Sequence, residues 1–178
     1  MKNELIRKSL HIAAAVCVAF VAPLMSLFLF VILCTIIIFS LPYIRWHKLV
    51  RRYILVPRGT HGDIYFFVGV LLTALFFLPY EKEAFEFGIL VLGFSDGLAA
   101  VVGQLSRSRG YRILGRKKTF IGSLTFFVST LLVGSLYAQT IAPLLFVCLL
   151  LTITENVVLS GFDNIVIPLF AAFLFGFF

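Results

Sequence analysis

An aspartate inside an apolar run is the residue whose type points most directly to chemistry. Asp96 lies within residues 93–103, GFSDGLAAVVG, and a strongly basic stretch, residues 106–118, follows closely. A carboxylate is expensive to place in an apolar setting, so such a residue usually serves a function. Cations beside it suit a polyanion, and metal-bound phosphate commonly accompanies a carboxylate. We therefore expect phosphate chemistry here; the alternative is a structural ion pair between Asp96 and an arginine.

The basic stretch ends in side chains that bind phosphate well. Lys117, Lys118, Thr119 and Ser123 can donate hydrogen bonds to phosphate oxygens near the start of a helix. Neighbouring glycines let backbone amides approach an anion closely. The alternative is a loop whose cations only record the orientation of the chain in a membrane.

Three further acidic residues and two histidines are candidates. Glu155 lies in an apolar run with no cation nearby in sequence, which favours a chemical role, whereas Asp63 and Asp163 can each cap a helix. His11 and His61 lack metal-ligand spacing. We interpret both as hydrogen-bonding or phosphate-contacting residues rather than zinc ligands.

The composition is that of a membrane protein. Of the 178 residues, 61% are hydrophobic and 13% are charged. The formal charge of +7 lies in segments between apolar runs, which favours a lipid bilayer over nucleic acid as partner. The sequence predicts an all-α polytopic integral membrane protein with one domain, residues 1–178, and about seven transmembrane helices in one bundle.

The apolar runs give the approximate bounds of these helices. We expect them at residues 9–22, 24–41, 63–79, 84–105, 119–138, 141–159 and 164–178.

Local signals refine this prediction. Pro23 marks a turn and Pro42 the end of the second helix. Ser95, Ala99 and Gly103 repeat every four residues, a spacing that lets another helix approach closely. Asp96 lies on the adjoining stripe and should therefore face protein or a cavity.

The distribution of cations predicts the topology. Of the 15 Lys and Arg residues, all but Lys82 lie in the N-terminal lead-in or in two basic loops, residues 43–62 and 106–118. The positive-inside rule then places the N-terminus in the cytoplasm and the C-terminus outside. The same topology places Asp63, Glu155 and Asp163 at the cytoplasmic ends of their helices, with Asp96 two to three helical turns deeper.

Five stretches, in order along nearly the whole chain, resemble motifs of the membrane lipid-alcohol kinases that use CTP, namely dolichol kinase, phytol kinase and CTP-dependent diacylglycerol kinase. These stretches are ELIRKSLHI (4–12), HGDIYFFVG (61–69), SDGLAAVVG (95–103), GRKKTFIGSL (115–124) and ENVVLSGFDNIVIP (155–168). The link from Gly103 to Gly115 is longer than the family's usual one. The aspartate and lysine motifs are also similar to those of CDP-diacylglycerol synthases.

The resemblance implies transfer of the γ-phosphate of CTP to the hydroxyl of a lipid alcohol at the cytoplasmic face, with Mg²⁺ as cofactor. The alcohol would be a polyprenol or dolichol, a phytol-like prenol or diacylglycerol. Asp96, Lys118, Glu155 and Asp163 would be catalytic, with Asp96 and Asp163 as metal ligands. Glu155 or Asp63 would orient or deprotonate the alcohol.

The resemblance also implies a set of nucleotide-binding residues. This set comprises Arg7, Lys8, His11, Gly103, Lys117, Lys118, Thr119, Gly122, Ser123 and Asn164.

Two other functions stay open at this point. One is a cytidylyltransferase that forms a CDP-lipid, and the other is a small transporter or scaffold. A transporter commonly shows paired repeats or broken helices in two halves, and the sequence shows neither. An oligomer is possible in each case.

Overall fold

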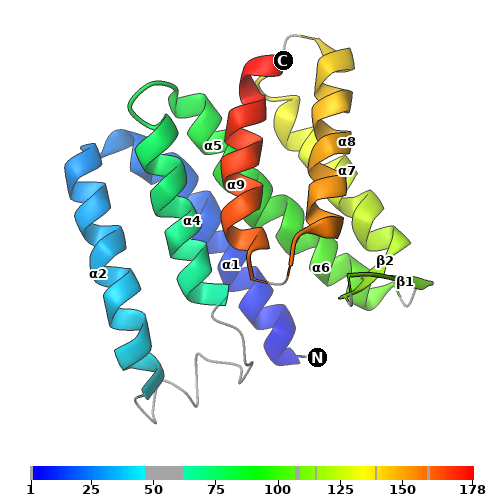
Figure 1. Ribbon diagram of the computed structural model, residues 1–178, viewed down its shortest axis with the longest axis horizontal. Helices are drawn as coiled ribbons and strands as arrows, with labels where there is room; N and C mark the ends of the chain where they lie inside the picture. The colour runs from blue at the N-terminus through cyan, green and yellow to red at the C-terminus, as the bar shows by residue number, and fades with distance from the viewer. Residues whose placement is uncertain (1, 47–61, 107–108, 115, 139, 160) are drawn as a thin grey trace.

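The computed structural model describes residues 2–46, 62–106, 109–114, 116–138, 140–159 and 161–178, and it shows a helical bundle (Figure 1). Its α-helices are α1 (Lys2–Val21), α2 (Leu27–Trp46), α4 (Gly62–Phe77), α5 (Lys82–Leu90), α6 (Asp96–Leu105), α7 (Phe120–Gly134), α8 (Ile141–Val157) and α9 (Asp163–Leu174). Short 3₁₀ helices lie at Ala22–Leu24 and Phe175–Phe177. The predicted helical class is confirmed.

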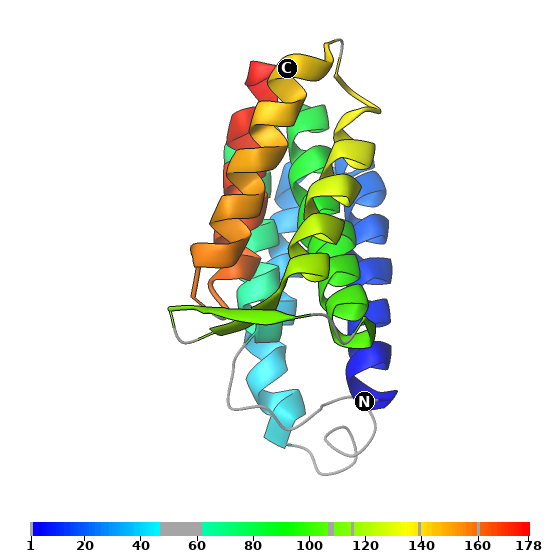
Figure 2. The same ribbon diagram turned by 90° about the vertical axis from the view of Figure 1, so that its right-hand side faces the viewer.

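A β-hairpin departs from that prediction. Strands β1 (Gly110–Ile113) and β2 (Arg116–Thr119) pair antiparallel where a basic loop was expected. The hairpin connects α6 to α7 and runs across the end of the bundle (Figure 2). The predicted loop is therefore wrong in its local structure, because cross-strand backbone pairing orders the segment.

The predicted end of the second helix is also wrong. Helix α2 continues through Pro42 to Trp46. A proline removes one backbone donor, the one that would bond the carbonyl of Ile38, but leaves the following residues free to stay helical. The turn predicted at Pro23 is confirmed, since this proline lies in the first turn of the 3₁₀ helix that follows α1.

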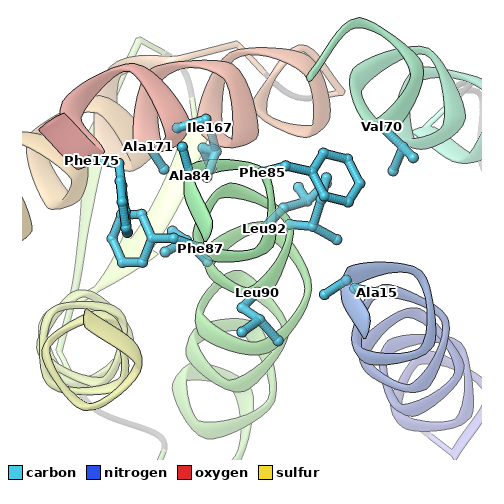
Figure 3. Close-up of a cluster of buried hydrophobic side chains, with 14 of the residues drawn as sticks. Ala15, Val70, Ala84, Phe85, Phe87, Leu90, Leu92, Ile167, Ala171 and Phe175 are labelled. Carbon is cyan, nitrogen blue, oxygen red and sulfur yellow. The ribbon is translucent and has the colours of Figure 1, made fainter. Parts of the chain in front are cut away.

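A long central rod organises the core. Helix α5, the π-helical turn η2 (Val91–Ser95) and α6 form a continuous helical segment from Lys82 to Leu105, and 67% of its apolar 18-residue stretch is buried. The rod contacts α1, α4, α7 and α9. Phe85, Phe87 and Leu92 point from it into the surrounding helices and are fully buried (Figure 3). The sequence predicted this rod as one uniform helix and missed the π-helical turn directly before Asp96.

Small residues bring the rod close to its neighbours. A Cβ atom added to Gly93 would lie 1.9 Å from the Cβ of Ala15 on α1. One added to Gly103 would lie 2.8 Å from Thr119 Oγ1 and 3.3 Å from Gly122 Cα. The close helix approach predicted at Gly103 is thereby confirmed, and its partner is the start of α7.

Helix α9 approaches the rod and α4 in the same way. A Cβ atom at Gly69 of α4 would lie 2.0 Å from the backbone oxygen of Asn164, and one at Gly88 of α5 would lie 2.5 Å from that of Pro168. These contacts fix the start of α9 against the middle of α4 and the next turn of α9 against α5.

The outer surface of the bundle is strongly apolar. Helix α2 exposes Phe28 and Phe39, each 77% accessible. Among the described residues, two segments, Leu27–Ile44 and Lys82–Leu105, are long and apolar enough to cross a membrane, and five shorter apolar helices accompany them. The number of membrane spans stays a prediction.

The close contact at Gly69 predicts a specific loss of stability. Gly69→Ala places a methyl group on the backbone of α9, which should destabilise the protein by about 1–3 kcal/mol or prevent folding. Gly176→Ala is the matched control, since its Cβ would meet no described atom within 4 Å. Thermal unfolding in detergent measures both; equal melting temperatures for the two variants would contradict the packing.

Candidate active site

The polar segments gather at one end of the bundle. The N-terminal end of α1, the start of α4, the β-hairpin and the turn between α8 and α9 all lie there, and the C-terminus lies at the other end (Figures 1 and 2). The clustering predicted from the charge distribution is confirmed. Which side of a membrane this end faces stays a prediction.

Lys8 and Asp96 form a nearly buried ion pair between α1 and α6. The Lys8 Nζ donates to Asp96 Oδ2 at 2.8 Å, and the two side chains are 14% and 10% exposed. Gly97 allows this approach, because a Cβ there would lie 2.4 Å from Cγ1 of Ile12 on α1. Asp96 therefore faces protein, as predicted, and its partner is a lysine rather than an arginine.

Lys118 and Glu155 form a second pair between β2 and α8. The Lys118 Nζ donates to the Glu155 carboxylate and, at 3.1 Å, to the Glu155 backbone oxygen. The side chains are 14% and 7% exposed. Glu155 thus has a cation that its own stretch of sequence did not show.

The two pairs belong to one charged cluster. Lys118 and His11 both lie within electrostatic range of Asp96, and the His11 ring packs against Phe66 with centroids 4.5 Å apart. Removing an ion from water costs several kcal/mol unless a partner compensates it. The cluster therefore holds two cations that can bind phosphate and two carboxylates that can bind a metal ion or accept a proton.

The hairpin separates two lysines that the sequence had grouped together. Side chains alternate between the two faces of a strand, so Lys117 and Lys118 point in opposite directions. Lys117 is exposed and pairs across the hairpin with exposed Arg112, whereas Lys118 turns inward beside Tyr111. The structure thus joins Lys118 to the cluster and leaves Lys117 on the outer face.

Tyr111, Ser123 and Asn156 form a polar network next to the cluster, and sequence reasoning missed Tyr111 and Asn156. The Tyr111 hydroxyl donates to Asn156 Oδ1 at 2.6 Å and lies 2.5 Å from Ser123 Oγ. Ser123 Oγ also donates to Asn156 Oδ1, at 3.0 Å. The sequence signal for this network was Asn156, which directly follows Glu155 in an apolar run. A buried side-chain amide needs hydrogen-bond partners.

Thr119 and Gly122 shape the start of α7. Thr119 is the N-cap, and its Oγ1 accepts a hydrogen bond from the Gly122 backbone amide at 3.1 Å. Gly122 packs against Gly103 of α6. The nucleotide contacts expected of these three residues and of Ser123 stay predictions.

The turn between α8 and α9 holds Asp163 and Asn164. Asp163 Oδ1 accepts from the backbone amides of Gly161 and Asn164, at 2.9 and 3.0 Å. The N-cap of α9 is Phe162, so the capping role predicted for Asp163 is wrong. Asp163 is instead the first residue of α9, and its side chain stabilises the turn before the helix. Asn164 Nδ2 donates to the Gly62 carbonyl at 2.7 Å, which ties the starts of α4 and α9 together.

The remaining candidates are Asp63, Arg7 and His61. Asp63 lies in the first turn of α4, at the same end as the cluster. The Arg7 side chain and His61 lie outside the described residues.

Comparison with known proteins supports the resemblance noted in the sequence. Over 131 residues, 67% of this chain, 28% of positions are identical to a phytol kinase from Synechocystis sp.. This chain is similar to a lipid-alcohol kinase. The matched region covers 55% of the phytol kinase, so the chain spans about half the length of this curated relative. No protein-family profile and no solved structure matches.

The donor set around Asp96 suits a particular kind of metal site. Within the described ranges, no three His, Cys, Asp or Glu side chains converge to hold a metal ion. Mg²⁺ usually takes one or two protein carboxylates and completes its shell with water and substrate phosphates. The carboxylates of the cluster fit such an open site; pairing of Asp96 with Asp163 as ligands stays a prediction.

Replacing Asp96 tests whether the pair is functional or structural. Asp96→Asn leaves a nearly buried Lys8 without its counter-ion, so we expect a loss of up to about 3–5 kcal/mol of stability. Lys8→Met combined with Asp96→Asn should restore the melting temperature, since neither position then holds an unpaired buried charge.

Turnover should stay at least about 10²-fold below wild type in both variants, because the carboxylate is missing. Phosphorylation of a lipid alcohol measures this. Near-wild-type turnover of the double variant would show that the pair is structural.

Proposed function

We propose that the protein is a CTP-dependent lipid-alcohol kinase embedded in the membrane. The observation that carries this proposal is the buried cluster of Lys8, Asp96, Lys118 and Glu155 at one end of an apolar bundle. The similarity to a phytol kinase supports the class of reaction. CTP as donor, and a polyprenol, phytol-like prenol or diacylglycerol as acceptor, come from the motif resemblance.

The exposed apolar side chains support a membrane location. Soluble monomers seldom expose large contiguous apolar areas, whereas α2, α7 and α8 carry large apolar residues along their outer faces. In this proposal seven helices span the bilayer, and the N-terminus and the cluster lie at the cytoplasmic face, where the Lys and Arg residues gather.

The cluster supplies the groups that phosphoryl transfer needs. Lys8 and Lys118 bind the phosphate oxygens and offset the negative charge that develops there. Glu155 accepts the proton of the lipid hydroxyl, which reaches the cluster laterally from the bilayer. Asp96 and Asp163 would hold Mg²⁺, which would supply further neutralisation of phosphate charge.

The topology can be checked with single cysteines in a cysteine-free background. Tyr80→Cys lies between α4 and α5, and Arg112→Cys lies on the outer face of the hairpin; both native side chains are exposed. A membrane-impermeant maleimide should label Tyr80→Cys from outside and Arg112→Cys only in inverted vesicles. Labelling of both from the same side would refute the topology.

The reaction can be checked with labelled nucleotide. Purified protein in liposomes receives a lipid alcohol, Mg²⁺ and CTP labelled at the γ- or the α-phosphate. We expect only the γ-label in the lipid, a preference for CTP over ATP, and no transfer in EDTA.

Other outcomes have distinct meanings. Transfer of the α-label when a lipid phosphate replaces the alcohol would indicate a cytidylyltransferase, and transfer of neither label to either lipid would indicate a transporter or scaffold. Full activity in EDTA would overturn the metal-dependent mechanism, and a preference for ATP would overturn CTP as donor.

A further inference from the structure

The inner face of the hairpin carries two side chains that reach adjacent residues of α8. Tyr111 and Lys118 are directly opposite each other in the β1–β2 register. Tyr111 bonds Asn156, and Lys118 bonds Glu155. We infer that Tyr111 is a positioning residue that fixes the place of the Lys118 ammonium in the cluster, an inference that rests on the proposed kinase function only for its effect on turnover.

The cross-strand geometry links the two side chains mechanically. Opposite residues on one face of an antiparallel pair have Cβ atoms about 4.5–5.5 Å apart. A rotation of the hairpin that moves Tyr111 away from Asn156 therefore moves Lys118 away from Glu155 as well. The Tyr111 hydroxyl and the Lys118 ammonium thus hold the inner face of the hairpin to two adjacent residues of α8.

The hairpin depends on such anchors. Its strands have four residues each, and a two-stranded hairpin of this kind is marginally stable on its own in water. Thr119 fixes one end by capping α7, but it lies at the base of the hairpin. Tyr111 lies only one pair further along, but its side chain bonds Asn156 of α8, which restrains rotation of the sheet about that base.

The Tyr111 network is partly buried, and Asn156 is its buried centre. Asn156 is 9% exposed, and its Nδ2 donates to the Thr152 carbonyl at 2.8 Å, which orients Oδ1 toward the two hydroxyls. The Tyr111 ring also packs on Phe120, with centroids 4.8 Å apart. In Tyr111→Phe this ring contact remains, while the hydrogen bond from the Tyr111 hydroxyl to Asn156 is lost.

Amine labelling tests the positioning directly, without any substrate. Lys118 and Lys8 have equally exposed side chains, 14% each, and both are ion-paired, whereas Lys117 is exposed. In Tyr111→Phe, labelling of Lys118 by an amine-reactive reagent should rise about two- to tenfold, which corresponds to one lost hydrogen bond.

Labelling of Lys8 and Lys117, resolved by tandem mass spectrometry, should stay unchanged. Equal labelling of Lys118 in wild type and variant would overturn the inference, and so would a parallel rise at Lys8, because it would indicate general loosening. Tyr137→Phe is the matched control. Tyr137 lies beyond the C-terminal end of α7, and the variant removes a hydroxyl that donates to Glu86. It should leave Lys118 labelling unchanged.

A double-variant cycle tests the consequence for the reaction. Tyr111→Phe should lower kcat/KM for the nucleotide about two- to tenfold in the wild-type background. In the Lys118→Ala background the same change should have no further effect, because the group that Tyr111 positions is gone. Equal effects in both backgrounds would contradict action through Lys118.

The two experiments separate the inference from the proposed function. If the protein transfers no phosphate but Lys118 labelling still rises selectively, the kinase proposal fails and the positioning role stands. If phosphate transfer is confirmed but labelling does not change, the positioning role fails and the kinase proposal stands.

Discussion

Charge burial inside an apolar bundle is the constraint on which the rest of this structure depends. Each lysine–carboxylate pair joins segments far apart in sequence: Lys8 pairs with Asp96, and Lys118 with Glu155. An unpaired ion at these depths would cost several kcal/mol. The helices must therefore pack closely enough for short side-chain bonds, and the glycines at the α1, α6 and α7 contacts allow that approach.

Under the proposed kinase function, the pairing also explains how such a cluster is kept ready for a highly charged ligand. Two cations and two carboxylates balance one another when no ligand is present. A metal-bound triphosphate brings both signs of charge, so it can offer a new partner to each group. The cost of separating the pairs is then offset by equivalent contacts, and electrostatic groups fixed before the reaction need little reorganisation.

Composition, charge distribution and small-residue spacing predicted much of the fold. The helices and the gathering of polar segments follow from the apolar runs and from the distribution of the cations, all of which except Lys82 lie in the N-terminal lead-in or the two basic stretches. The burial of Asp96 followed from its apolar surroundings. The hairpin was missed because glycines and cations resemble a loop locally, while its order comes from cross-strand pairing and from Tyr111 contacts to distant helices.

The candidate site was predicted only in part, because its geometry also depends on contacts between distant segments. Lys118 and Glu155 were both chosen, but their pairing depends on the approach of β2 to α8, which no local pattern encodes. Lys117 and Lys118 look equivalent in sequence, and only strand alternation distinguishes them. Asn156 went unnoticed because a single amide in an apolar run gives no sign of its partners.

The π-helical turn before Asp96 sets the rotational phase of the central rod. Each residue of an α-helix advances the side-chain direction by about 100°. A π-helical turn accommodates one residue more than an α-helical turn of similar rotation. Loss of one residue from Val91–Ser95 that restores an α-helical turn would therefore leave α6 in nearly the same orientation, with Asp96 facing Lys8. A one-residue gap here in a related sequence would thus signal replacement of the π-helical turn by an α-helical one, with the geometry around Asp96 retained.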